Sequence, residues 1–481
     1  MDTFPLNAIR TLLFLCIAVF ISFGQRQSET RFASAVSSTN LRKQVQDLVS
    51  YGNRLGGTAS GSKAAAYVAN RFKDFGLVPE TVQDPEKLSS TVQSWSLSVD
   101  KPNRLRGLIQ NDWLGLFSPS TKPSKARLKF WDKSVELKSV DAESSVVLVQ
   151  NGVSESEYRE LVRAGARAVL TFAVVNSPAY SNWSLIENLP EKTDNPIPLY
   201  SISNVAGKRL VEELHDSVAV QISFSSKTRI QKARPKTIIA TLHGKSSKYF
   251  LVCAHGDGDS GGPGADDNAS GVSGVLELAR VFNSMIDRGQ LPMPTNSIKF
   301  AVWGSEYFST SAYVKRNADS LEQILAVLNF DEIGTGKSRN CLYFEGNDVD
   351  QNESLLRLFD SVATEYVGKR GFWSEATTNP SQGGTDSYVF LPDFLRKLDV
   401  SRVEIPSITI YSAAWNEPKR IKQTRGWNSK AWHGPKDSVV VDYSMFYHSS
   451  LDIPKFTTEK EPFNMSWAVK AVGIALLRRA W

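Results

Sequence analysis

The feature that most constrains the fold is the alternation of strand and helix patterns after residue 236. Short apolar runs, which are typical of buried strands, are separated by amphipathic helical segments. This alternation favours an α/β fold in which a mixed central sheet is covered by helices on both faces. The expected strands are 237–242, 249–254, 298–303, 324–330, 341–345 and 407–411, and the expected helices are 269–286, 355–367 and 467–477.

We expect the 481 residues to divide into four parts, the first of which is the short N-terminal segment 1–24. Residues 25–104 form an N-terminal helical part, with helices at 41–51 and 59–75. Residues 105–225 have shorter strand and helix patterns, and we expect them to form a smaller α/β domain inserted into the chain. The basic cluster 227–236 is expected to be a linker, and residues 226–481 hold the main domain.

The first 24 residues are expected to be a signal peptide. The apolar run 11–24 follows Arg10 and is shorter than the roughly 20 residues of a membrane span. We therefore expect a secreted or periplasmic protein with no stable membrane span after cleavage near Gln25. An uncleaved membrane anchor is the alternative.

Charge and cysteine content exclude two classes of protein. The chain has 56 Lys and Arg against 50 Asp and Glu, and the basic residues are scattered, so we expect no nucleic-acid partner. Three cysteines cannot form a disulfide scaffold, and only five histidines are available for metal binding or catalysis.

Polar residues lie at the expected strand ends, where ligands collect in α/β sheets. Each alone has an ordinary interpretation, such as a helix cap or a loop acid, but together they form a mixed nitrogen and oxygen donor set that suits zinc. Asp267 could bridge two ions, and Asp257 could orient the ring of His255. The residues are His255, Asp257, Asp267, Glu306, Asp331 and, far downstream, His448.

Four sequence blocks resemble the M28 family of zinc peptidases. They are His255-Gly256-Asp257, the block 264–271 with Asp267 at the bridging position, Asn329–Gly334, and Tyr447-His448 followed by Asp452. Residues 145–211 resemble a protease-associated (PA) domain. The resemblance implies a zinc-exopeptidase-like fold, peptide or protein substrates, and one or two zinc ions. The implied metal ligands are His255, Asp267, Asp331 and His448.

One position departs from the family pattern, which has adjacent glutamates as base and ligand. Here Glu306 is followed by Tyr307. Either Glu306 is the base and one ion has lost a ligand, or Glu306 is the ligand and Glu332 is the first candidate base. We expect a tight ion at Asp267, Asp331 and His448, and a weak or absent ion at His255.

The expected function is that of a zinc exopeptidase, most simply an aminopeptidase. Glu306 would be the general base, Asp257 would support His255, and Tyr447 would donate a hydrogen bond to the developing oxyanion. One alternative is a non-catalytic M28-like ectodomain used for binding, which would explain the altered glutamate pair. A minor alternative is a serine protease through Ser260, whose flanking residues resemble those of a serine nucleophile. The α/β pattern around Ser260 argues against that alternative.

Overall fold

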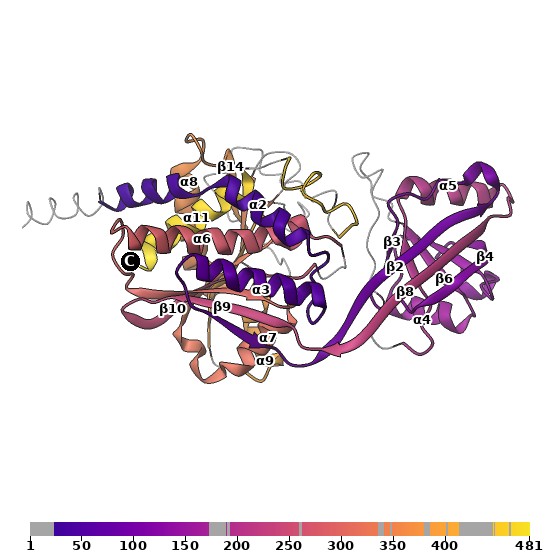
Figure 1. The fold of residues 1–481 in the computed structure, drawn as a ribbon, viewed down its shortest axis with the longest axis horizontal. Helices are drawn as coiled ribbons and strands as arrows, with labels where there is room; N and C mark the ends of the chain where they lie inside the picture. The colour runs from indigo at the N-terminus through magenta and orange to yellow at the C-terminus, as the bar shows by residue number, and fades with distance from the viewer. Residues whose placement is uncertain are drawn as a thin grey trace, which may run out of the picture.

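The computed structural model describes residues 24–172, 189, 193–258, 262–334, 341–346, 349–379, 385–400, 403–412, 446, 448–460 and 463–481. In these ranges the chain forms an eight-stranded and a seven-stranded sheet, which lie at opposite ends of the ribbon in Figure 1. Both sheets are mixed and carry helices, so the expected α/β class is confirmed.

The eight-stranded sheet has the order β1-β9-β11-β10-β12-β15-β13-β14. Its four central strands, β11, β10, β12 and β15, run parallel to their neighbours within that group, and antiparallel pairs flank them. The central strands are buried on both faces, which explains their nearly continuous apolar runs. The strands are β1 (Pro79–Gln83), β9 (Lys236–Leu242), β10 (Ser246–His255), β11 (Asn296–Trp303), β12 (Ile324–Phe330), β13 (Cys341–Glu345), β14 (Glu375–Asn379) and β15 (Ser407–Tyr411).

Helices cover both faces of this sheet (Figure 1). One face packs against α2 (Ser38–Val49), α3 (Ala59–Asp74), α6 (Gly271–Asp287), α8 (Glu353–Tyr366) and α11 (Asn464–Arg479), and the other against α7 (Phe308–Arg316) and α9 (Pro392–Lys397). The central helix α6 is buried almost all round, including the polar residues Ser273 and Glu277. Its apolar positions at helical spacing are fully buried, namely Val272, Val275, Leu276, Ala279 and Phe282.

The seven-stranded sheet has the order β2-β8-β4-β5-β6-β7-β3. Helices α4 (Glu155–Arg163) and α5 (Asn204–His215) supply apolar side chains to its two separate cores. The shorter strand patterns expected in residues 105–225 include β5 (Val146–Gln150) and β6 (Ala168–Phe172). The other strands are β2 (Lys87–Lys101), β3 (Trp113–Leu114), β4 (Thr121–Trp131), β7 (Leu199–Ser201) and β8 (Gln221–Ala233).

The connection between the two sheets differs from the sequence-based expectation. The long antiparallel strands β2 and β8 run as a ribbon from the first sheet to the second (Figure 1). β2 lies inside the segment expected to be helical, and most of the basic cluster expected to be a linker belongs to β8. Much of this ribbon is exposed or half-buried on both faces, so it lacks the apolar alternation by which a half-buried strand is recognised.

The expected signal peptide lies outside the described residues, apart from Gly24. Residues 24–35 are helical, and this segment packs on the main sheet's helical layer through the fully buried Phe32. Its Glu29 carboxylate pairs with Arg478 of α11 at 2.7 Å. In the described ranges, no helix combines the length and the apolar character that crossing a membrane requires.

Candidate metal centre

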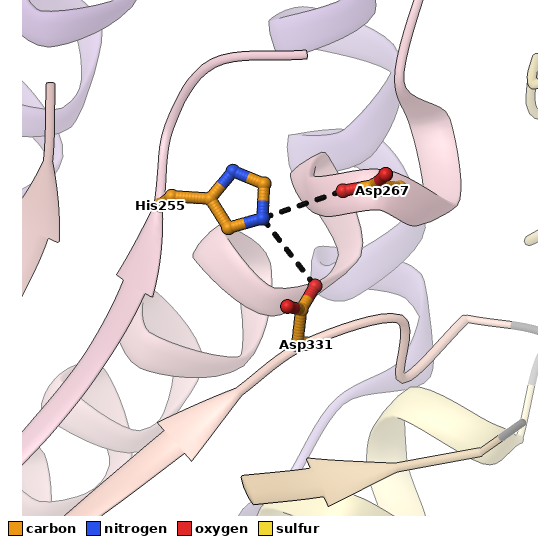
Figure 2. Close-up of side chains that lie close together, drawn as sticks. All are labelled: His255, Asp267 and Asp331. Atoms are coloured by element: carbon orange, nitrogen blue, oxygen red, sulfur yellow. Dashed lines mark ion pairs between the residues drawn. The ribbon is translucent and has the colours of Figure 1, made fainter. Parts of the chain in front are cut away.

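Three of the predicted ligands meet at one edge of the eight-stranded sheet. His255 ends β10, and Asp331 directly follows β12, the parallel neighbour of β10. Asp267 lies in the short helical turn η4 (Ala265–Ser270), directly before α6. Parallel strands bring their carboxyl ends to the same edge, which explains the convergence. Figure 2 shows the three side chains pointing toward one another.

The spacing of these three side chains suits a metal ion. The Nε2 atom of His255 lies 3.3 Å from Asp267 Oδ1 and 3.4 Å from Asp331 Oδ1. Two ligands at roughly 2.1 Å from a tetrahedral zinc ion are about 3.4 Å apart. Asp331 Oδ1 is buried without a hydrogen-bond donor in the described part of the chain, which leaves it available to a cation. The donor set therefore fits zinc.

His448 approaches the same centre from the opposite side of Asp267. Its Nε2 atom lies 3.0 Å from Asp267 Oδ2, while His255 faces Asp267 Oδ1. The carboxylate of Asp267 thus lies between two imidazoles, as a bridging ligand would. However, the sequence assigned His255 and Asp331 to separate ions, whereas the structure places their donor atoms in one group with Asp267.

Asp257 links the histidine to the loop that carries Glu306. Its backbone oxygen lies 3.1 Å and its Oδ1 atom 3.3 Å from His255 Nδ1, so the ring presents Nε2 to the centre. The same Oδ1 atom accepts a hydrogen bond from the backbone N–H of Glu306 at 3.1 Å. Asp257 therefore contacts both the ring of His255 and the start of the Glu306 loop.

The two adjacent aspartates have different surroundings. Asp267 faces the histidines, whereas Asp266 Oδ1 accepts a hydrogen bond from the backbone N–H of Gly334. Asp452 holds the pair in place, since its two carboxylate oxygens accept hydrogen bonds from the N–H groups of Asp266 and Asp267 at 2.9 and 3.0 Å. In the sequence, Asp452 was noted only as part of a motif, and its hydrogen bonds to the backbone of Asp266 and Asp267 were not predicted.

Burial and charge set the protonation of this acidic cluster. Burial opposes ionisation of Asp267, but hydrogen bonds from His255 and His448 outweigh it and hold the pKa of Asp267 below its usual range. Burial, reinforced by Asp452, raises the pKa of Asp266 well above its usual range. Burial favours a neutral His255, but Glu306 and Asp331 outweigh it and raise the pKa of that ring. Asp267 is thus the ionised member of the pair.

The loop after β11 carries Glu306 half-buried beside the centre. The next residue, Tyr307, has a φ of 52° and donates its backbone N–H to Asp386 Oδ1 at 2.9 Å. Burial, with the charge of Glu306, raises the pKa of Tyr307 far above its usual value, so its phenol stays protonated. A neutral phenol is a poor replacement for the anionic glutamate ligand of the family.

Asp386 was not found by sequence reasoning. It is buried at the start of the short helix η7 (Asp386–Phe390), accepts a hydrogen bond from the Thr310 hydroxyl, and has an Oδ2 atom without a partner among the described residues. Burial raises the pKa of Asp386 to about 7. The preceding Thr385 donates its hydroxyl to Asp331 Oδ2. No local pattern marks these residues, because their partners are distant in sequence.

Glu332 is a poor candidate for the base. Its side chain is 3% exposed, and its backbone oxygen accepts two hydrogen bonds from Ser412. Burial, together with the charges of Asp267 and Asp266, raises the pKa of Glu332 well above its usual value. A carboxyl group that holds its proton at neutral pH cannot accept another.

Two predicted residues lie outside the described part of the chain. They are Tyr447, expected as the oxyanion donor, and Ser260, expected only in the serine-protease alternative. The segment 415–444, which contains Trp427 and Trp432, also lies outside it.

Comparison with known proteins agrees with this geometry. The family model described as "Peptidase family M28" matches residues 237–452, which include all four predicted metal ligands and Glu306. Over residues 237–452, the chain is thus similar to peptidase family M28. The expected resemblance is thereby confirmed for the main domain.

Two relatives illustrate the extent of the similarity. The chain is 24% identical over 439 residues to aminopeptidase YwaD of Bacillus subtilis, which covers 88% of this chain and 83% of the relative. It is 32% identical over 215 residues to a probable lipoprotein aminopeptidase, LpqL, of Mycobacterium tuberculosis. That second alignment covers 44% of this chain and 40% of the relative, so it spans less than half of either protein.

Solved structures share the fold over nearly the whole chain. A peptidase M28 precursor from Shewanella amazonensis matches with a TM-score of 0.65 and 15% identity, covering 95% of this chain and 97% of that one. A zinc aminopeptidase from Bacillus subtilis matches with a TM-score of 0.57 and 20% identity, covering 92% and 95%. At these identities the likeness confirms the fold, including the smaller second sheet.

Proposed function

We propose that this protein is a zinc-dependent exopeptidase that removes residues from the amino ends of peptides. The observation that carries the proposal is the buried group of His255, Asp267 and Asp331, which lies beside the half-buried Glu306 inside an M28 domain. Relatives named as aminopeptidases support the choice of the amino end.

One zinc ion would be held by His255, Asp267 and Asp331, with His448 in reach of the free side of Asp267. Three protein ligands leave a fourth position of a catalytic zinc site open to water or substrate. When bound, zinc lowers the pKa of a coordinated water toward neutrality and polarises the substrate carbonyl. Tyr307 in place of the second glutamate supports one ion rather than two.

The protein's own residues would supply proton transfer and orientation. Glu306 accepts a proton from the attacking water and delivers it to the leaving amine. Asp257 contacts both the ring of His255 and the backbone N–H of Glu306. It would therefore fix the position of the metal ligand His255 relative to the base Glu306. Tyr447, next to His448 in the sequence, would donate a hydrogen bond to the oxyanion.

We also propose where the protein is located and which type of domain the smaller sheet belongs to. Residues 1–24 would direct secretion or export to the periplasm, and residues 105–225 would form a PA-like domain. Mass spectrometry of the exported protein tests the first, since the mature chain should begin near Gln25. Detection of the uncleaved chain in the membrane fraction would instead support the anchor.

A non-catalytic binding protein is the second candidate, because Tyr307 replaces a glutamate that the family uses. Metal analysis combined with hydrolysis of a panel of aminoacyl anilides and dipeptides separates the two. Bound zinc with hydrolysis of unblocked substrates supports the exopeptidase. Bound zinc without hydrolysis of any substrate would support the binding protein, and hydrolysis of acetylated substrates alone would exclude an aminopeptidase.

A further inference from the structure

Arg54 is a buried cation in the turn between α2 and α3, far in sequence from the metal centre. Its side chain is 1% exposed. Within the described ranges, its guanidinium donates four hydrogen bonds, and all of them go to backbone carbonyl oxygens. The acceptors are Gly256 at 3.0 Å, Gly52 at 3.1 Å, Pro263 at 2.7 Å and Gly264 at 2.8 Å.

Three of these acceptors flank the loop that joins two metal ligands. Gly256 directly follows His255, while Pro263 and Gly264 precede Asp267 by three to four residues. A single guanidinium therefore connects the end of β10 with the entry to η4. Because the fork of an arginine is planar and rigid, its hydrogen bonds fix the separation of the two segments that they join.

The backbone around Arg54 is fitted closely to it. Gly264 has a φ of 60°, and a Cβ atom there would lie 2.9 Å from Arg54 Nη2 and 2.4 Å from the backbone oxygen of Asp267. Gly258 donates its N–H to the backbone oxygen of Asn53 at 2.8 Å. The loop from β10 to η4 is thus held against the Arg54 turn at both of its described ends.

The charge of Arg54 also suits this place. Burial lowers the pKa of Arg54 to about 10, although Asp452, Asp257 and Asp267 oppose that shift, so the guanidinium remains charged at neutral pH. The positive charge lies near the acidic cluster without forming an ion pair with it in the described structure. The four hydrogen bonds of Arg54 all go to backbone oxygens, and the Asp267 carboxylate faces His255 and His448.

We propose that Arg54 is a positioning residue that sets the spacing of His255 and Asp267 and thereby the affinity of the centre for zinc. The inference rests on the proposed zinc site but not on peptidase activity. It predicts that Arg54 variants change metal binding itself, in addition to any effect on folding.

The test compares Arg54→Met and Arg54→Lys with Arg478→Met, a control that removes a partly buried arginine bound to Glu29 away from the centre. The zinc Kd is measured by competition with a chromophoric chelator, and the Co²⁺-substituted protein is examined by visible absorption. We expect both Arg54 variants to bind zinc roughly 10- to 100-fold more weakly, with an altered Co²⁺ spectrum. The control should lower the melting temperature and leave the zinc Kd unchanged.

A wild-type zinc Kd and Co²⁺ spectrum in both Arg54 variants would overturn the proposal, even if the zinc-free protein melts at a lower temperature. Wild-type affinity in Arg54→Lys alone would also overturn it, because charge without the fork would then suffice. Arg54→Lys decides the matter if Arg54→Met does not fold. A wild-type protein that binds zinc but hydrolyses no peptide would refute the proposed function and leave this measurement valid.

Discussion

Asp257 and Glu306 are joined by a hydrogen bond of 3.1 Å from the backbone N–H of Glu306 to Asp257 Oδ1. The same oxygen lies 3.3 Å from Nδ1 of His255. One buried carboxylate thus links a proposed metal ligand to the proposed base. A displacement of Asp257 would therefore disturb metal binding and proton transfer together.

Asp257→Asn tests this link. The asparagine oxygen can still accept the hydrogen bond of Glu306, but the negative charge that supports His255 is lost. We expect activity or zinc affinity to fall roughly 10- to 100-fold, measured as kcat/KM and as zinc Kd. Asp47→Asn, which removes the charge of a half-buried partner of Lys43 and Tyr67, is the matched control and should leave both values unchanged. Equal values for Asp257→Asn and the wild type would show that the link has no role.

A chelator should separate metal catalysis from serine catalysis. We expect phenanthroline to abolish hydrolysis, because the proposed chemistry depends on the ion at His255, Asp267 and Asp331. A serine-directed sulfonyl fluoride should have no effect, and Ser260→Ala should retain most of the activity. Inhibition by the sulfonyl fluoride, with loss of activity in Ser260→Ala, would instead support the serine-protease alternative.

The sequence predicted those parts of the site that depend on local pattern and strand order. His255 and Asp331 end apolar runs that read as neighbouring parallel strands, so their convergence follows from the fold class. Arg54 and Asp386 could not be predicted in the same way. Arg54 binds carbonyl oxygens more than 200 positions away, and Asp386 binds the N–H of Tyr307 79 positions away. Backbone groups carry no sequence signature, so such contacts become visible only in the folded chain.

The ribbon of β2 and β8 was missed for a different physical reason. A strand is recognised by alternation between a buried and an exposed face, and much of this ribbon is exposed or half-buried on both. Pairing over 13 residue pairs joins the two strands, and only part of the ribbon, including Leu97 and Phe224, faces a core. The basic residues of 227–233 are therefore solvated strand residues as well as a connection between the two sheets.

The adjacent aspartates should respond differently to substitution. Asp267→Ala removes the carboxylate that lies between His255 and His448, and we expect zinc and activity to be lost together. Asp266→Ala removes only an acceptor for the N–H of Gly334, and we expect it to keep more of both. Metal analysis and kcat/KM on the two purified variants check this. The reverse ranking would move the ligand assignment by one residue.

Asp386 should make the stability of the zinc-free protein depend on pH. Its pKa is raised from the ordinary value of 3.8 to about 7, so the folded state favours the protonated form. This contribution is complete below about pH 4 and is lost as the pH rises through 7. Asp386→Asn cannot ionise, and we expect it to be more stable than the wild type at pH 8 by roughly 1–4 kcal/mol. Urea unfolding at pH 5 and pH 8 measures the difference, and an equal pH dependence in both proteins would contradict it.

The number of ions follows from which histidine shares an ion with Asp331. The structure places Asp331 Oδ1 3.4 Å from His255 Nε2, whereas His448 Nε2 lies 3.0 Å from Oδ2 on the other side of Asp267. We therefore expect one tightly bound zinc ion per chain, lost in His255→Ala and weakened in His448→Ala. Retention of zinc in His255→Ala with loss in His448→Ala would restore the assignment made from the sequence, with the tight ion at Asp267, Asp331 and His448.

Glu306→Gln then decides between the base and the ligand. Glutamine keeps the size of the side chain but cannot accept a proton from water at neutral pH. If Glu306 is the base, turnover should fall roughly 10²–10⁴-fold while the zinc content per chain stays unchanged. If Glu306 is instead a ligand, the same substitution should lower the zinc content. The base would then have to be another group, and the buried, protonated Glu332 is poorly suited to that role.

Two tightly bound ions that survive Glu306→Gln would show that a further side chain completes a second site, because Tyr307 remains a neutral phenol beside Glu306. Metal analysis and kcat, measured on the same protein preparation, separate these outcomes.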